Sequence, residues 1–261
     1  MSSLVDIAKL AQIVDDAALA HRAIPKLTEE QELRMEEAYA VQATSIARRI
    51  GRGETRIGVK MGFTSRAKMI QMNCDDIIWG RLTSSMLIED GSIIRLRDYV
   101  HPRCEPEIAF LLKESLPANV TPARALAAVE AIAPAIEIID SRYEKFKFTA
   151  ADVVADNSSS SSLVVGPWCD PRQPFDNLGM LLEFDQRPVQ IGSSAAILGH
   201  PLRSLVSAAR LSADAGEPLQ AGWIVLAGGA TAAEALRPGL HVRAVVQNLG
   251  SVSFSVAGAE G

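Results

Sequence analysis

Two glutamates, Glu105 and Glu107, occupy alternate positions at the start of an apolar run that ends at Leu112. The run has the composition of a β-strand, in which residues i and i+2 project to the same face. Pro106, between them, points to the opposite face and has no N–H, so it suits a sheet edge or a bulge. Two adjacent carboxylates repel each other, and burying them without a counter-charge is costly. The pattern therefore predicts either a solvated strand face or a site for a hard divalent cation.

A third glutamate favours the cation site. Glu137 lies within the aliphatic run of residues 134–140, which also has the pattern of a short strand. A carboxylate among aliphatic side chains is rarely buried unless it is paired or binds a metal ion. Glu105, Glu107 and Glu137 are therefore candidate ligands of one metal ion, with Mg²⁺ expected and Mn²⁺ also compatible. Three protein ligands leave coordination positions for water or substrate.

Charge, hydropathy and cysteine content exclude several classes of partner. The chain has 261 residues, of which 48% are apolar, and a formal net charge of −5 with no basic block, which argues against nucleic acid. Its apolar runs are shorter than the roughly 18 residues of a membrane span, so no membrane partner is expected. No secretory signal is recognised. Cys74, Cys104 and Cys169 form no CxxC pair. They indicate free thiols, and a cytoplasmic location is expected.

Hydrophobic periodicity predicts helices in the first fifty residues and many short strands after about residue 55. A capping-box pattern predicts that the second helix begins at Thr28, and Gly51 predicts where that helix ends. Strands and helices alternate too rarely for a doubly wound sheet, so a closed or rolled mixed sheet is expected. We expect helices at 3–22, 28–50, 65–73, 121–132 and 200–213, and strands at 57–63, 107–112, 134–140, 163–166, 223–227, 241–247 and 251–256, with a hairpin at 181–191.

Five segments, in order and covering nearly the whole chain, together resemble one family. They are GVKMGFTS at 58–65, EPEIAF at 105–110, PAIEIIDSR at 134–142, ADNSSS at 155–160 and LAGGAT at 226–231. The chain resembles the fumarylacetoacetate hydrolase superfamily, and within it the hydratase/decarboxylase branch of catechol meta-cleavage pathways. The resemblance implies an α+β fold, a mixed β-sandwich roll with an N-terminal helical cap. We therefore expect a helical subdomain at 1–54 and a metal-binding catalytic domain at 55–261.

The resemblance also implies roles for individual residues. It makes Glu105, Glu107 and Glu137 the metal ligands, and it matches the family's motif lysine to Lys60. The family's substrate-binding serine falls within residues 158–161, and Ser160 is the expected one, although the extra serines leave its neighbours open.

The residues themselves make Lys60, Gly62, Trp79 and Thr231 candidates for the pocket. Lys60 lies between glycines, including Gly62, that permit close backbone approach. It is either a cation beside the substrate or a surface lysine at a strand end. Trp79 is either an apolar wall of the pocket or ordinary packing. The Gly-Gly turn before Thr231 is expected to bring that threonine toward the pocket, and the alternative reading of a phosphate loop lacks the necessary lysine.

The segment around Trp79 favours one reaction of this branch. Hydratases of the branch tend to carry an acidic residue and phenylalanine where this chain has Ile78 and Trp79. The segment HPRCEPE at 101–107 also resembles the decarboxylases of the branch. We therefore expect Mg²⁺-dependent decarboxylation of 2-oxohex-3-enedioate to 2-hydroxypenta-2,4-dienoate and CO2, with no organic cofactor. Hydration of that dienoate is one alternative, and a non-catalytic ligand-binding subunit is another. A hydrolase would need a histidine–glutamate pair, and residues 60–83 contain no histidine. The family further implies a homo-oligomer and a complex with the pathway hydratase.

Overall fold

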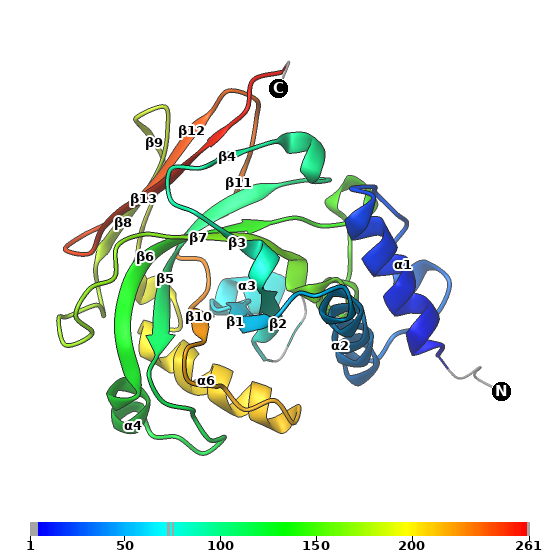
Figure 1. Cartoon of the computed structure of the whole chain (residues 1–261), viewed down its shortest axis with the longest axis horizontal. Coiled ribbons are helices and arrows are strands. Elements are labelled where there is room, and N and C mark those ends of the chain that lie inside the picture. Colours follow the sequence, from blue (N-terminus) through cyan, green and yellow to red (C-terminus); the bar gives the residue numbers. More distant parts are fainter. Residues whose placement is uncertain (1–4, 72–73, 75, 260–261) are drawn as a thin grey trace.

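Two β-sheets and six α-helices make up the computed structural model, which describes residues 5–71, 74 and 76–259 (Figure 1). The larger sheet has eight strands in the order β2-β1-β10-β5-β6-β7-β3, with β11 paired to β5. It is mixed, because β1 runs parallel to β10 whereas β5 runs antiparallel to β6. The strands are β1 (Arg56–Gly62), β2 (Ile78–Thr83), β3 (Leu87–Ile88), β5 (Arg103–Leu112), β6 (Val129–Ile139), β7 (Ser160–Val165), β10 (Ile224–Leu226) and β11 (Glu234–Ala235).

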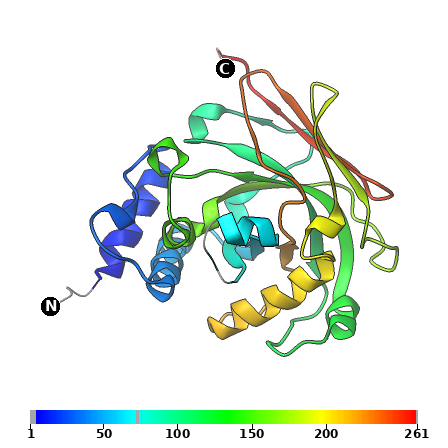
Figure 2. The same cartoon turned by 180° about the vertical axis from the view of Figure 1, so that it is seen from behind.

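The smaller sheet packs against one face of β6 and β7 and forms the sandwich part of the fold (Figures 1 and 2). Its order is β4-β13-β12-β8-β9, and the strands are β4 (Ile93–Ile94), β8 (Gly179–Phe184), β9 (Arg187–Ser193), β12 (His241–Val246) and β13 (Gly250–Val256). Alternate residues of both sheets meet in a buried layer that includes Ile136, Ile138, Leu182 and Phe254. This alternation is what a strand period of two requires of a two-layer core.

Helices cover the rest of the larger sheet. They are α1 (Ile7–Leu19), α2 (Met35–Gly51), α3 (Arg66–Gln71), α4 (Pro122–Ala127), α5 (Ala150–Ala155) and α6 (Pro201–Asp214). α6 packs Leu205 and Ala209 into the core that also contains Ile108 and Phe110 of β5. α1, α2 and α5 share a separate apolar cluster at the N-terminal side of the molecule (Figure 1). No helix among the described residues is long and apolar enough to cross a membrane.

The larger sheet curls so that its inner face holds both a core and a polar site. β2 and β7 approach each other although four strands separate them in the sheet order. Ala109, Ala133 and Ala135 point inward with Leu163 and Leu226. Small side chains at these positions leave room for the curvature. Along β5 the same face continues through Glu107 and Glu105, so strand alternation carries both carboxylates into the rolled sheet.

Most predicted elements are confirmed, including the mixed roll, but several helix boundaries are wrong. The first helix is shorter than the predicted 3–22, since residues 5–6 and 20–22 are not helical. The helix predicted for 121–132 ends at Ala127, because Val129 and Ile132 join β6 and pair with β5. The second helix begins at Met35 rather than Thr28, because Thr28 donates from both its backbone and its hydroxyl to Asp152. Within the helix predicted for 65–73, the last two positions lie outside the described residues.

Candidate active site

The three predicted glutamates lie together on two neighbouring strands. Glu105 and Glu137 are directly opposite each other in the β5–β6 register, and Glu107 follows on the same face of β5. Each offers a carboxylate oxygen within 4.8 Å of the others. Glu107 and Glu137 are fully buried, and Glu105 lines a cavity. The structure thus brings all three carboxylates to one point inside the rolled sheet.

A glycine turn after β10 supports two of these carboxylates. The backbone N–H of Gly228 donates to Glu107 Oε2 at 2.7 Å. Gly229 lies so close to Glu105 that a Cβ atom there would be 2.3 Å from Glu105 Oε2. Gly228 has φ +109, a left-handed conformation that glycine adopts at little cost. The Gly-Gly pair is therefore what permits the backbone to lie against the acidic cluster.

Lys60 supplies a positive charge to the cluster. It projects from β1, and its Nζ is 3.0 Å from Glu137 Oε2, with both side chains almost completely buried. Burial alone would lower the pKa of Lys60, but the attraction of Glu137, Glu105 and Glu107 outweighs burial and raises the pKa. The ammonium group is therefore stabilised in its charged form.

The charged forms of the three glutamates are destabilised, because three buried carboxylates lie beside a single ammonium group. Burial, together with repulsion from Glu137, raises the pKa of Glu105 to about 7. The same two causes raise the pKa of Glu107 well above its ordinary value. Burial also raises the pKa of Glu137, although Lys60 opposes the effect. Further positive charge at this point would relieve the repulsion.

These features fit a divalent cation. Glu107 Oε1 and Glu137 Oε1 are buried and have no hydrogen-bond partner among the described residues. Buried carboxylate oxygens normally have partners, and oxygen donors are what Mg²⁺ and Mn²⁺ prefer. The formal charge of three carboxylates and one ammonium is −2, which a divalent ion would neutralise.

A cavity of about 570 Å³ opens beside the cluster. Four of the residues singled out in the sequence line it, namely Lys60, Gly62, Glu105 and Thr231. Apolar side chains make up much of the remaining wall, and they include Ile78, Ile139, Phe146, Phe148 and Val153. Three further cationic residues, Lys68, Arg103 and Lys147, also line it. The cavity therefore suits an anionic ligand with an apolar middle.

Two residues of the serine segment, Ser158 and Ser159, line the cavity. Ser160, the expected substrate contact, does not line it. Ser160 is instead buried beside Glu137 at the start of β7. Ser158 is engaged, because its hydroxyl donates to the Trp79 carbonyl at 2.8 Å. The hydroxyl of Ser159 has no partner among the described residues. Ser159 is therefore the serine whose hydroxyl is available beside the cavity.

The expectation that Trp79 walls the pocket does not match the structure. Trp79 is 2% exposed and packs into the main core, where it stacks on Tyr39 and carries the Arg81 guanidinium 4.4 Å from its ring centre. Ile78 lines the cavity instead. Successive residues of a strand point to opposite faces, so the apolar wall comes from the neighbouring position.

Sequence reasoning also missed Arg103 and Phe146 as cavity residues. Arg103 was detectable, because it precedes Glu105 by two positions and shares its face of β5. Phe146 gave no such signal. It belongs to a short turn in which Lys145 and Phe146 both have positive φ, and only the fold brings that turn to the cavity.

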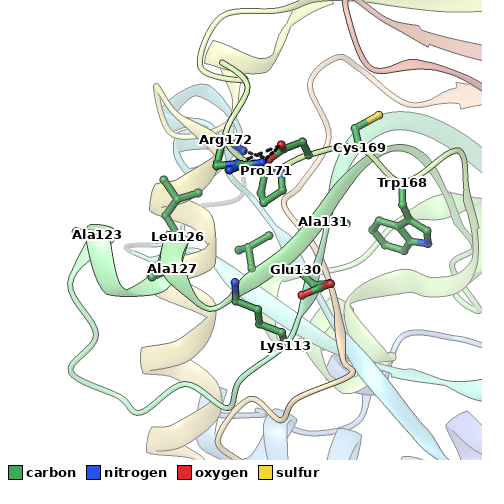
Figure 3. A pocket seen from close by; sticks show the side chains of 12 residues that line it. Lys113, Ala123, Leu126, Ala127, Glu130, Ala131, Trp168, Cys169, Pro171 and Arg172 are labelled. Atoms are coloured by element: carbon green, nitrogen blue, oxygen red, sulfur yellow. Dashed lines mark hydrogen bonds and ion pairs between the residues drawn. The ribbon is translucent and has the colours of Figure 1, made fainter.

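A second groove, of about 750 Å³, lies between α4, the start of β6 and residues 168–172 (Figure 3). The ionisable side chains along it, Lys113, Glu130, Asp170 and Arg172, are exposed, and Arg172 is paired with Asp170 at 2.6 Å. Of the residues named in the sequence analysis only Cys169 lies there, and none of the candidate metal, catalytic or substrate-binding residues does. Exposed, solvated charges offer little for chemistry, so the first cavity is the candidate active site.

The model of the fumarylacetoacetate hydrolase C-terminal family matches residues 49–257, which include every residue of the site described above. The chain belongs to this family. Among curated members, it is 58% identical to a 4-oxalocrotonate decarboxylase from a Pseudomonas species, over 97% of this chain and 98% of that protein. It is 34% identical to a 2-keto-4-pentenoate hydratase of Paraburkholderia xenovorans (strain LB400), over 85% and 83% of the two chains.

A solved structure of the same family gives a close match in three dimensions. The 4-oxalocrotonate decarboxylase from Pseudomonas putida G7, complexed with magnesium and adipate, aligns with a TM-score of 0.94 at 35% identity. The alignment covers 98% of this chain and all of that one. The family relationship therefore extends through the N-terminal helices as well as the rolled sheet.

Proposed function

We propose that this chain is a Mg²⁺-dependent decarboxylase that converts 2-oxohex-3-enedioate to 2-hydroxypenta-2,4-dienoate and CO2. The buried cluster of Glu105, Glu107 and Glu137 beside Lys60 is the observation that carries the proposal. The high identity to a 4-oxalocrotonate decarboxylase supports it, since the hydratase relatives are considerably less similar.

The reaction needs a sink for one electron pair. When the C5–C6 bond breaks, its electrons form C4=C5, the C3=C4 pair moves to C2=C3, and charge develops on the 2-oxo oxygen. A divalent cation held by Glu105, Glu107 and Glu137 would supply Lewis-acid stabilisation of that charge and a place for the adjacent 1-carboxylate. CO2 departs, and the oxygen takes up one proton to give the dienol.

Lys60 is the proposed catalytic residue of the chain itself. Its charged ammonium lies inside the cavity wall and is oriented by Glu137 at 3.0 Å. It stabilises negative charge on the substrate oxygen and holds the proton that the dienolate takes up. Among the described residues, Ser159 offers an unpaired hydroxyl at the cavity wall, whereas the hydroxyl of Thr231, which lines the same cavity, donates to the Ala232 carbonyl at 3.0 Å. The roles of Gly62 and Gly229 are to let the backbone approach closely.

The apolar wall favours decarboxylation over hydration. Ile78, Ile139 and Val153 line the cavity and restrict water beside the substrate's carbon chain. A carboxylate that is poorly solvated loses CO2 more readily, whereas hydration must deliver a water molecule to the diene.

The test is to mix the purified chain with 2-oxohex-3-enedioate and record CO2 release and the product spectrum, with Mg²⁺ and with excess chelator. Fast release that requires Mg²⁺ is expected. A parallel assay follows water addition to 2-hydroxypenta-2,4-dienoate. Faster conversion of the dienoate than of the dicarboxylate would move the assignment to the hydratase. No turnover of either, with ligand binding retained, would indicate a binding subunit.

We also propose that the chain self-associates and binds the hydratase that consumes its product. A dienol is unstable in water, so direct transfer between the two proteins would limit its loss. Large apolar side chains such as Ile93 and Ile191 are 70% and 76% exposed and offer contact surface. Light scattering of the pure chain, and co-purification with the hydratase, test these two parts separately.

A cytoplasmic location is proposed from the cysteines. Cys74, Cys104 and Cys169 are free thiols, and thiols persist in reducing compartments. Cell fractionation with an antibody to the chain checks this proposal.

A further inference from the structure

We propose that Arg103 binds the far carboxylate of a dicarboxylate substrate and thereby selects dicarboxylates over monocarboxylates. The inference rests on the proposed function, because it assumes that the near end of the substrate lies at the glutamate cluster. It adds a specificity-determining residue that the five matching sequence segments do not include.

Strand register places Arg103 at a suitable distance from the cluster. Glu105 pairs with Glu137 across β5 and β6, and the next pair on the same face is Arg103 with Ile139. Two residues along a strand span about 6.6 Å, which is close to the length of a six-carbon dicarboxylate chain. Both Arg103 and Ile139 line the cavity. A substrate with one end at the glutamates therefore reaches Arg103 with its other end.

Arg103 is held in place without an acidic partner among the described residues. Its guanidinium carbon is 4.6 Å from the centre of the Phe146 ring, a cation–π contact. Phe146 in turn meets the rings of His101 and Phe148 edge-on. Among the described residues, no carboxylate pairs with Arg103, whereas Arg56, Arg81 and Arg142 all have acidic partners. The N–H groups of Arg103 are thus free to bind a ligand.

Two lysines are the rival candidates. Lys68 and Lys147 line the same cavity, but both are exposed, whereas Arg103 is half-buried on a strand. An exposed lysine is strongly hydrated and flexible, so it gives little orientation. A stacked guanidinium offers two parallel N–H donors that match a carboxylate. Arg103 is therefore better suited than either lysine to bind and orient the far carboxylate.

This arrangement predicts a particular kinetic signature. The far carboxylate carries its charge in the bound substrate and loses it as CO2 departs. Arg103 therefore contributes more to substrate binding than to the transition state, and removing it raises KM more than it lowers kcat. The same change should weaken binding of adipate, a dicarboxylate, and leave binding of hexanoate, a monocarboxylate of equal length, unchanged.

The experiment compares Arg103→Gln, Arg103→Lys and Lys147→Gln with the unaltered protein, all with Mg²⁺. Arg124→Gln, on the exposed end of α4, is the matched surface control. Arg103→Gln should raise KM and the adipate Kd by about tenfold or more, equivalent to about 1.4 kcal/mol, with hexanoate Kd within about twofold. Arg103→Lys, which keeps the charge, should recover part of the loss. Melting curves establish that the variants fold.

Equal weakening of adipate and hexanoate by Arg103→Gln would overturn the inference, as would a loss confined to kcat. Loss of adipate selectivity in Lys147→Gln but not in Arg103→Gln would assign the carboxylate to the lysine instead. The binding measurements do not require turnover. If the unaltered chain released no CO2, the proposed function would be wrong. The difference between adipate and hexanoate binding would still show whether Arg103 selects dicarboxylates.

Discussion

Lys60 Nζ lies 3.0 Å from Glu137 Oε2, and neither side chain has appreciable contact with solvent. The two residues come from β1 and β6, which are separated in the sheet by β10 and β5. Curvature of the larger sheet closes this gap. A buried ion pair of this kind contributes little net stability, because desolvation opposes the attraction. The ion pair instead fixes the Lys60 ammonium group next to three carboxylates that repel one another.

Replacing Glu107 by glutamine tests the metal site. Glu107→Gln removes one negative ligand while keeping the shape of the side chain. We expect Mg²⁺ affinity to fall by at least about 100-fold and turnover to be abolished, with the fold retained. Calorimetric titration with Mg²⁺ and circular dichroism measure the two outcomes. Glu130→Gln, an exposed glutamate in the other groove, is the control (Figure 3). Full activity of the unaltered chain in excess chelator would contradict a metal mechanism.

Replacing Lys60 by methionine tests the proposed proton donor. Lys60→Met keeps much of the apolar stem but removes the charge beside Glu137. We expect kcat to fall by about 10²- to 10⁴-fold, the usual contribution of a positioned acid or base. Mg²⁺ still binds, because the three carboxylates remain. Steady-state kinetics at saturating Mg²⁺ measure the effect. A variant that kept kcat within a few-fold of the unaltered value would show that Lys60 has a packing role only.

The raised carboxyl pKa values predict an unusual dependence of stability on pH. The pKa of Glu105 is raised from 4.5 to about 7 in the folded protein by burial and by repulsion from Glu137. Between these two values the metal-free folded state binds more protons than the unfolded state. Its stability is therefore highest at the acidic end of this interval and falls as pH rises through it.

Mg²⁺ should reverse the trend, because the cation replaces the protons on the carboxylates. Its affinity is expected to increase as pH rises over the same interval, with protons released on binding. Thermal unfolding in chelator and in excess Mg²⁺, at several pH values between about 5 and about 8, measures both effects. A melting temperature in chelator that rose steadily with pH would be inconsistent with the raised pKa values.

Replacing Gly229 by alanine tests the glycine turn. A Cβ atom at this position would lie 2.3 Å from Glu105 Oε2, so the carboxylate must move. We expect weaker Mg²⁺ binding, by about tenfold or more, with a nearly unchanged melting temperature in chelator. Gly51→Ala is the matched control, because a Cβ there meets nothing within 4 Å. Unchanged Mg²⁺ affinity in Gly229→Ala would mean that Glu105 has room to shift without cost.

The amino-acid sequence by itself determined the features that depend on local periodicity. A strand has a period of two, so Glu105 and Glu107 had to share a face wherever the strand was placed. The aliphatic setting of Glu137, the lysine between glycines at Lys60 and the short strands after residue 55 were equally readable from local pattern. These signals, with the order of the matching segments, were sufficient to anticipate a rolled mixed sheet around an acidic cluster.

Only the tertiary structure decided which face of each element meets the cavity. Trp79 and Ile78 are adjacent on β2, and local pattern does not say which of them points inward, because both faces of that strand are buried. Val129 and Ile132 left the predicted helix because pairing with β5 outweighs helix propensity. Arg103 and Phe146 are in contact although they are 43 positions apart in the sequence. Contacts between residues so far apart in the sequence depend on how the sheet curls. Packing of the whole core sets this curvature, so local sequence patterns do not predict such contacts.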